Sequence, residues 1–433
     1  MKLFSLPWAR VVFALFVGAV FFMPLPMRGQ EPPIDPARGR QLMQKSSRGE
    51  TLTSEEQAYL DRVKQEIRKR AAGKPAGAVP PAAAARSLAV NTNDWSALVP
   101  LTDMTGPYRG EDGGLYGGGR NDPPAAHRAA HLRESEKIRP LDAEGKPSDQ
   151  GKIGLITIGF SNTSIESEAF KRGADADPQK SPRVIIVNGA IGGRSAVMWA
   201  WDGAAVLPPA EQERLDREMD VVHLPKSNRR SSPGLDKDTW PTLAQRIKAA
   251  GLSPRQVQVG WLKQVEANPK PLGEFPAHAR ALQADITAIL NIARHHYPNL
   301  RVLYLSSRTF GGWSGRESGS PEPFAYESGF GTRWIVQSQI KGDPQLNFDP
   351  ARGDVKAPLV LWGPYLWAQG NSPRKFDGLV WTENDVRADR LHPNESGSRK
   401  TTAQLLNFFK TNEGAGRWFL KSGEQGRAAP LPQ

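Results

Sequence analysis

The 433-residue chain contains no cysteine. Disulfide bonds, thiolate–metal sites and lipid attachment through cysteine are therefore excluded. An exported protein that avoids stray thiols has this composition. The glycine-rich run from Tyr108 to Asn121 also lacks a GxGxxG or GK[ST] pattern and follows no clear strand, which argues against a nucleotide-binding loop.

Basic residues outnumber acidic ones, giving a formal net charge of +12, but they are scattered among acidic residues. The densest group, Lys226 to Arg230, has no interleaved aromatic residues and belongs to no recognisable nucleic-acid-binding module. We therefore predict no nucleic-acid partner. The positive net charge supports a more modest inference than nucleic-acid binding, namely affinity for anionic surfaces or polysaccharides.

Residues 1–29 resemble a targeting segment. Lys2 and Arg10 give a positively charged N-terminal region. The apolar stretch that follows, from Val11 to Met23, is short for a membrane span. We predict a signal peptide, with an uncleaved anchor as the alternative. Secretion or periplasmic export follows, without stable membrane insertion after cleavage.

The rest of the chain divides by composition into four parts. Residues 30–72 form a short helical region, in which the sequence from Thr53 to Glu56 is typical of a helix start. Residues 73–97 read as an Ala/Pro-rich linker. The main domain is expected over 98–412, followed by a tail over 413–433.

Strand and helix patterns alternate through the main domain. Helices are predicted over 277–297 and 396–409, where apolar residues recur at helical spacing. Apolar, β-branched runs predict strands within 151–159, 183–187, 256–261, 300–305 and 359–362. This alternation predicts an α/β fold, a three-layer α/β/α sandwich with a five-stranded, mostly parallel sheet.

Ser161 stands where the first of these strands stops. Gly159 allows a sharp turn there, and the carboxyl ends of strands are where open α/β folds bind their ligands. The alternative is a structural one, because Thr163 and Glu166 match a capping box at the start of the next helix.

Two long insertions, 194–255 and 307–357, leave the carboxyl ends of predicted strands. Such loops build substrate pockets in α/β enzymes. We name Asn162, Trp199 and Tyr326 as candidate substrate-binding residues, with loop packing as the alternative for the aromatic pair.

His127 and His131 lie four residues apart on a predicted helix, a spacing that can hold zinc. The acid of the HExxH motif is absent and no third ligand is apparent, so no metal site is predicted.

Asp389 and His392 precede the last predicted helix. Pro393 disfavours helical geometry at His392, so the loop can fold with the carboxylate accepting from one ring nitrogen. The other nitrogen then faces outward as a base, and Ser161 would complete a nucleophilic triad. The alternative is a turn with an exposed histidine.

Together these stretches resemble the SGNH (GDSL-type) hydrolases, a resemblance that covers roughly residues 150–412. The family's serine motif corresponds to Gly159–Asn162, and its DxxH pair to Asp389 and His392. The segment Val187–Gly193 is similar to the family's second block, whose glycine donates a backbone N–H to the oxyanion; Gly193 matches it best.

Two departures from the family pattern stand out. Phe160 replaces the aspartate before the serine. The family's third block supplies an asparagine side chain to the oxyanion hole, but no asparagine occupies that place in Gly260–Gln264. Lys263 or Gln264 is the expected substitute donor.

The resemblance implies an exported serine esterase that forms an acyl-enzyme on Ser161. His392 would act as the base, Asp389 would orient it, and the N–H groups of Ser161 and Gly193 would bind the oxyanion. No cofactor is implied. The expected partner is a small-molecule or polysaccharide ester, such as an acetylated carbohydrate; no oligomeric state is predicted. The alternative is a catalytically impaired protein of the same fold that binds carbohydrate or the cell surface.

Overall fold

The computed structural model describes residues 35, 38, 42, 45, 52–72, 95–203, 209–221 and 239–421. They belong to two compact units, which divide between residues 85 and 86. The predicted signal segment, the basic group at 226–230, most of the linker and the end of the tail lie outside the described residues.

The first unit contains helix α2, Ser54–Ala72. The helix start predicted at Thr53 is confirmed: the Glu56 N–H donates to the Thr53 hydroxyl at 3.2 Å, and the Thr53 N–H donates to the Glu56 carboxylate at 2.9 Å. This reciprocal pair satisfies two backbone donors that the first turn leaves open. The Tyr59 hydroxyl also accepts from the Asp35 N–H at 2.7 Å, which ties the preceding segment to the helix.

The second unit is built on a five-stranded sheet of order β2-β1-β3-β4-β5. All of its strand pairs are parallel, so the predicted α/β sandwich is confirmed. The strands are β1 Ile153–Gly159, β2 Val184–Val187, β3 Val257–Lys263, β4 Val302–Ser306 and β5 Leu359–Trp362, within a few residues of the predicted ranges.

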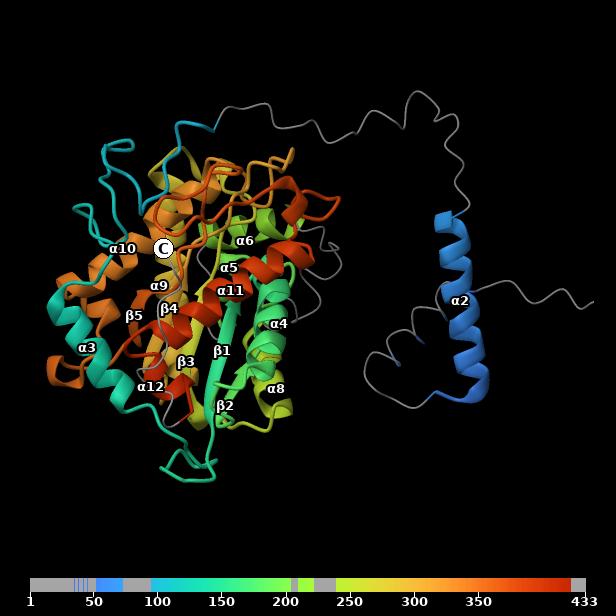
Figure 1. Ribbon diagram of the computed structural model, residues 1–433, viewed down its shortest axis with the longest axis horizontal. Helices are drawn as coiled ribbons and strands as arrows, with labels where there is room; N and C mark the ends of the chain where they lie inside the picture. The colour runs from blue at the N-terminus through green and yellow to red at the C-terminus, as the bar shows by residue number, and fades with distance from the viewer. Residues whose placement is uncertain are drawn as a thin grey trace, which may run out of the picture. The chain divides into compact units, whose positions relative to one another are not determined.

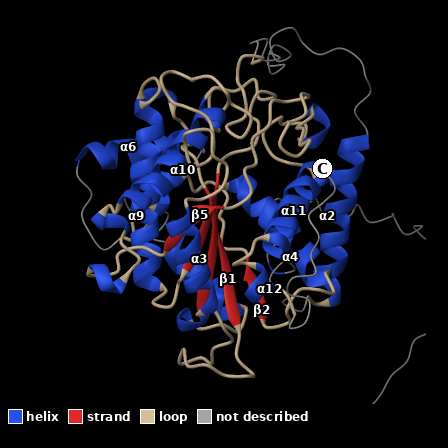
Figure 2. Cartoon of the chain, turned by 60° about the vertical axis from the view of Figure 1, so that its left-hand side comes forward, coloured by secondary structure: helices blue, strands red, loops and turns tan. Residues whose placement is uncertain are grey.

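Helices cover both faces of the sheet (Figures 1 and 2). Helices α5, α8, α9 and α10 contribute to the core on one face, and α3, α4, α11 and α12 to the core on the other. The α-helices of this unit are α3 Ala125–Glu136, α4 Ser161–Ala176, α5 Ala196–Trp199, α6 Pro209–Val221, α8 Thr239–Ala249, α9 Ala277–His296, α10 Phe324–Lys341, α11 Glu395–Thr411 and α12 Gly416–Phe419. Short 3-10 helices occur at Pro254–Gln256, Lys270–Leu272, Pro344–Leu346, Pro350–Arg352 and Glu383–Asp385.

The sheet is apolar on both faces because successive side chains of a strand point to opposite sides. In β3, Leu262 belongs to the core beneath α9 and α10, whereas Val259 and Trp261 belong to the core beneath α4 and α11. Full burial of each such side chain is worth about 1.5–3 kcal/mol, so the central strands hold the three layers together.

The strand order places a topological switch at β1. The chain passes from β1 to β2 on one side, and then to β3 on the other side of β1. Chain segments that leave the carboxyl ends of β1 and β3 therefore diverge and open a crevice, which is the usual ligand position in open α/β folds. Ser161 directly follows β1 at this point.

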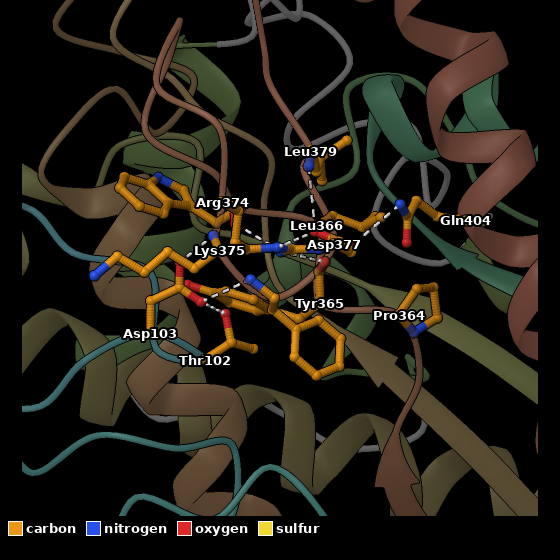
Figure 3. A network of polar contacts seen from close by, with 12 residues as sticks. Thr102, Asp103, Pro364, Tyr365, Leu366, Arg374, Lys375, Asp377, Leu379 and Gln404 are labelled. Atoms are coloured by element: carbon orange, nitrogen blue, oxygen red, sulfur yellow. Dashed lines mark hydrogen bonds and ion pairs between the residues drawn. The ribbon is translucent and has the colours of Figure 1, made fainter. Parts of the chain in front are cut away.

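A network of polar contacts fixes the long connection between β5 and α11 (Figure 3). The Arg374 guanidinium donates to the backbone carbonyls of Tyr365 and Trp367 at 2.7 and 2.9 Å. It also binds Asp377 through two nitrogens, at 2.8 and 2.6 Å. Gln404 of α11 donates to the same carboxylate at 3.2 Å. The network thus anchors the connection to α11, the helix that follows Asp389 and His392.

The end of β1 tolerates no added side chain, and substitution of Gly159 tests this. A Cβ at position 159 would lie 2.5 Å from the Lys263 carbonyl oxygen and 2.5 Å from the Thr163 side chain. We expect Gly159→Ala to lower the free energy of unfolding by about 1–3 kcal/mol, the usual cost of overpacking. Urea unfolding followed by circular dichroism measures it.

Gly106→Ala is the matched control, because nothing lies within 4 Å of its added Cβ. A Gly159→Ala protein with the same unfolding midpoint as the control would contradict the packing at this strand end.

Candidate active site

Ser161 is the first residue of α4, and the chain turns into this helix directly from β1. Phe160 between them is extended, with φ −94° and ψ −168°, and its side chain packs against Val265 and Ala267 in the loop after β3. The serine hydroxyl therefore stands at the carboxyl edge of the sheet, at the positive end of the α4 dipole.

The expected capping box at Thr163 and Glu166 is wrong. Helix α4 begins at Ser161, two residues before Thr163, so Thr163 lies inside the first turn. Its hydroxyl donates instead to the Lys263 carbonyl oxygen at 2.8 Å. Glu166 forms a buried ion pair with the Lys263 ammonium. Both side chains thus tie α4 to the end of β3.

The loop from Asp389 to His392 presents its imidazole in a fixed orientation. The Asp389 carboxylate accepts from the His392 ring nitrogen Nδ1 at 2.7 Å and from the backbone N–H groups of Leu391 and His392 at 3.0 Å each. Arg390 adopts φ 54°, a left-handed conformation that is uncommon for a residue with a side chain. This tight turn is what allows the carboxylate to reach both the ring and the backbone.

The structure brings Ser161 and His392 together across 231 residues of sequence. The His392 nitrogen Nε2 lies 2.9 Å from the Ser161 Oγ. With the ring proton on Nδ1 donated to Asp389, Nε2 accepts the hydroxyl proton. A chain from carboxylate to imidazole to hydroxyl can remove a proton from the serine as its oxygen attacks an electrophile.

The Asp389 carboxyl is held in its ionised form. Burial alone would raise its pKa, but the His392 backbone N–H, the His392 ring and the Leu391 N–H together lower that pKa from 3.8 to about 2. The side chains of His392 and Asp389 are 25% and 33% exposed, so the relay is accessible from solvent. A permanently charged partner stabilises the imidazolium that forms when His392 takes a proton.

The turn after β2 folds back onto the end of β1. The Ile191 N–H donates to the Gly159 carbonyl oxygen at 3.0 Å, and a Cβ added at Gly192 would lie 3.9 Å from the Ser161 Cβ. Gly193 has φ 76°, which favours glycine. Within the described residues, the N–H groups of Ser161 and Gly193 donate to no other group. Both N–H groups therefore remain available to a ligand.

Lys263 and Gln264 were expected to supply a donor to the oxyanion hole. The structure shows that both side chains are buried and bind other groups. Lys263 is 3% exposed and paired with Glu166; burial lowers the pKa of its ammonium, although the carboxylate opposes this. The Gln264 amide donates to the Arg194 carbonyl oxygen at 3.0 Å and accepts from the backbone N–H of the next residue. These contacts engage the polar groups of both side chains with partners other than Ser161.

The substrate-binding roles expected of Trp199 and Tyr326 are wrong, because both side chains lie in the core at 0% and 1% exposure. Trp199 packs edge-to-face on Trp240, and the Tyr326 hydroxyl contacts the Met104 sulfur at 3.3 Å. These two aromatic side chains therefore pack in the core and do not line a pocket.

Asn162 is also buried, at 3% exposure, and is likewise unavailable to a substrate. Its side-chain amide donates to the Leu391 carbonyl oxygen at 3.0 Å. The residue after the serine therefore holds the loop that carries His392 against the start of α4.

Asn268 lies on the loop after β3, and the sequence interpretation did not single it out. The loop after β3 returns to the site: the Ala196 N–H donates to the Val265 carbonyl oxygen at 3.0 Å, and Val265 packs on Phe160. Asn268 follows this segment and is half-buried. The available signal was that Asn268 is the first asparagine after β3, five residues beyond the strand end.

The two helical histidines bind the sheet rather than a metal. His127 Nε2 lies 2.8 Å from the Val360 carbonyl oxygen, and His131 Nε2 lies 2.8 Å from the Tyr304 hydroxyl. Burial lowers the pKa of His131 to about 4, so its ring is neutral at pH 7. Among the described residues, no group of three His, Asp or Glu side chains could hold a metal ion.

A cleft of about 640 Å³ lies between the 102–131 segment, the end of β5 and the second half of α11. Tyr116, Trp362, Arg374 and Phe408 are among its lining residues, and the relay residues are not. The relay therefore opens to solvent elsewhere on the molecule.

Comparisons of the chain with protein-family models, curated proteins and solved structures found no match. In the part of the chain that the structure describes, no helix has the length and apolar character needed to cross a bilayer.

Replacement of His392 tests what holds the Asp389 carboxyl ionised. In His392→Ala the ring contact is lost while both backbone donors remain, so the Asp389 pKa should rise from about 2 towards its ordinary 3.8. Carbon-13 NMR of labelled aspartate carboxyls would follow the titration. An Asp389 pKa unchanged by this substitution would show that the ring contributes nothing.

The same shift sets a pH dependence of stability. Because the folded-state pKa is lowered, the ionised carboxyl stabilises the fold above about pH 4, and this contribution is lost as the pH falls towards 2. The contribution is small, since the carboxyl is largely solvated.

Proposed function

We propose that the protein is a serine hydrolase of the SGNH type, which cleaves esters through an acyl-enzyme on Ser161. One observation carries the proposal. The His392 ring lies between the other two residues, with Nε2 at 2.9 Å from the Ser161 Oγ and Nδ1 at 2.7 Å from the Asp389 carboxylate. The position of this relay at the β1 switch point supports the same function, because α/β enzymes bind substrates there.

In the proposed reaction, the Ser161 Oγ attacks the ester carbonyl carbon while His392 Nε2 takes the hydroxyl proton. The tetrahedral intermediate then collapses, and the imidazolium returns this proton to the departing alcohol. A water molecule, deprotonated by the same nitrogen, attacks the acyl-enzyme and releases the carboxylic acid with free Ser161. The ionised Asp389 stabilises each imidazolium, and no metal or organic cofactor takes part.

The negative charge on the carbonyl oxygen needs donors that are already in place. The N–H groups of Ser161 and Gly193 are two of them. We assign the third to the side-chain amide of Asn268, because the Lys263 and Gln264 side chains have other partners and the 265–267 segment packs beside Phe160.

We further propose that the substrate is an ester carried on a carbohydrate, and that the protein acts after export. The solvent exposure of His392 and Asp389 supports a bulky substrate, since no enclosed cavity has to contain it. Export rests on the basic and apolar pattern of residues 1–29.

A serine-reactive fluorophosphonate tests the activation of Ser161. We expect one covalent adduct on the wild-type protein by intact-mass measurement, and none on Ser161→Ala. Hydrolysis of an aryl acetate should fall by about 10³-fold or more in Ser161→Ala. Ser164→Ala, three residues along the same helix, is the control and should retain labelling and turnover.

No adduct on folded wild-type protein would contradict the esterase. That outcome would instead support a non-catalytic protein of the same fold that binds carbohydrate or the cell surface.

Asn268→Ala tests the third donor. We expect kcat for the aryl ester to fall by about 10²–10³-fold with little change in KM, because this amide would bind the oxyanion only as charge develops. Circular dichroism serves as the folding control. A kcat within about threefold of wild type would remove Asn268 from the oxyanion hole.

A further inference from the structure

Glu218 lies on α6, in the insertion between β2 and β3, and its carboxylate reaches the loop that follows β3. Its two oxygens accept from the backbone N–H groups of Ala267 and Asn268, each at 2.7 Å. The residue is 2% exposed. Two charge-assisted hydrogen bonds to adjacent backbone donors are a rigid clamp, because the carboxylate plane fixes both N–H directions together.

The loop that Glu218 binds also contacts the turn after β2, because the Ala196 N–H donates to the Val265 carbonyl oxygen at 3.0 Å. Ser195 lies close enough to lower the pKa of Glu218, although its hydroxyl does not reach hydrogen-bond geometry. Burial acts in the opposite sense and raises that pKa overall. Ser195 follows the Gly193 turn by two residues. Glu218 is therefore linked to both loops that flank Ser161: directly to the loop after β3, and through that loop to the turn after β2.

Helix α6 is itself fixed at this position by a buried cation one turn earlier. Arg214 is ion-paired with Glu266 at 2.8 Å and donates to the Asp285 carboxylate of α9 at 3.0 Å. Glu266 directly precedes the two residues that Glu218 binds. Helix α6 thus holds one stretch of loop at three successive positions, and it is anchored to α9 by the same arginine.

These contacts are made to the loop after β3 and not to a strand of the sheet. Without Glu218, the backbone N–H groups of Ala267 and Asn268 would lose their acceptor. We propose that Glu218 is a positioning residue, which fixes the Asn268 loop and the Gly193 turn so that their donors converge on the oxyanion formed at Ser161. This inference rests on the proposed function.

The test combines hydrogen exchange with kinetics on the full chain. Glu218→Gln keeps the shape of the side chain but replaces one acceptor by an amide donor, so one of the two loop N–H groups loses its partner. Glu218→Ala removes both acceptors. Glu213→Gln is the matched control, because Glu213 lies on the same helix with its side chain 72% exposed.

In both Glu218 variants, peptides that contain residues 264–269 and 192–196 should exchange about tenfold faster than in wild type, while β1 peptides stay unchanged. The kcat for the aryl ester should fall by about 100-fold with KM within about threefold, since a displacement of about 1 Å at the oxyanion donors costs this much. The Glu213→Gln control should match wild type in both measurements.

Unchanged exchange in the two loops would overturn the clamp. Faster exchange with unchanged kcat would overturn the positioning role while leaving the clamp. A wild-type protein without turnover or labelling contradicts the proposed hydrolase and, with it, the positioning role; the exchange measurement still decides whether Glu218 holds the loops. Glu218→Gln keeps the test usable if Glu218→Ala fails to fold.

Discussion

The buried ion pair between Lys263 and Glu166 is the contact on which the geometry at Ser161 depends. It joins the last residue of β3 to the second turn of α4, and the Thr163 hydroxyl reinforces it at the Lys263 carbonyl. A buried pair adds little net stability, yet loss of one partner costs about 3–5 kcal/mol because the other charge is left unpaired. The pair therefore fixes where α4 begins relative to the sheet, and with it the direction of the Ser161 hydroxyl.

The same strand ends set the positions of the other functional groups. In the parallel pairing of β1 with β3, Gly159 lies opposite Lys263, so the loops that follow both strands start level with each other. The turn after β2 bonds back to Gly159, and Asn162 holds the carbonyl of Leu391 beside His392. Four segments distant in sequence thus meet within a few residues of one glycine.

Much of this was predictable from sequence. Strand periodicity and β-branched runs located all five strands, and the residues around Pro393 predicted the loop geometry that places His392. The relay was predictable because its residue types and chain order are chemically restrictive. The neighbouring positions were harder, since Asn162, Trp199 and Tyr326 carry side chains that suit either a pocket or a core.

The burial of the Lys263 side chain against α4 has a specific physical cause. Side chains alternate across a strand, so Lys263 shares the face of Trp261 and Val259, which is covered by α4. The alternation can be read from the sequence. The sequence does not show that Glu166 of α4 lies against the same face of the sheet and pairs with Lys263. The Asn268 loop was not singled out for a related reason: the Glu218 carboxylate, fifty residues away in sequence, binds its backbone, and the sequence does not show this contact.

The partial exposure of His392 and Asp389 has a consequence for the shape of molecule that the proposed enzyme can process. A nucleophile at the bottom of a closed cavity accepts only chain ends or detached fragments. Here the relay lies at the sheet edge, with a quarter to a third of these two side chains in contact with water. A decorated polymer could lie across the site and lose an ester group midway along its length, without an end being threaded and without its backbone being cut.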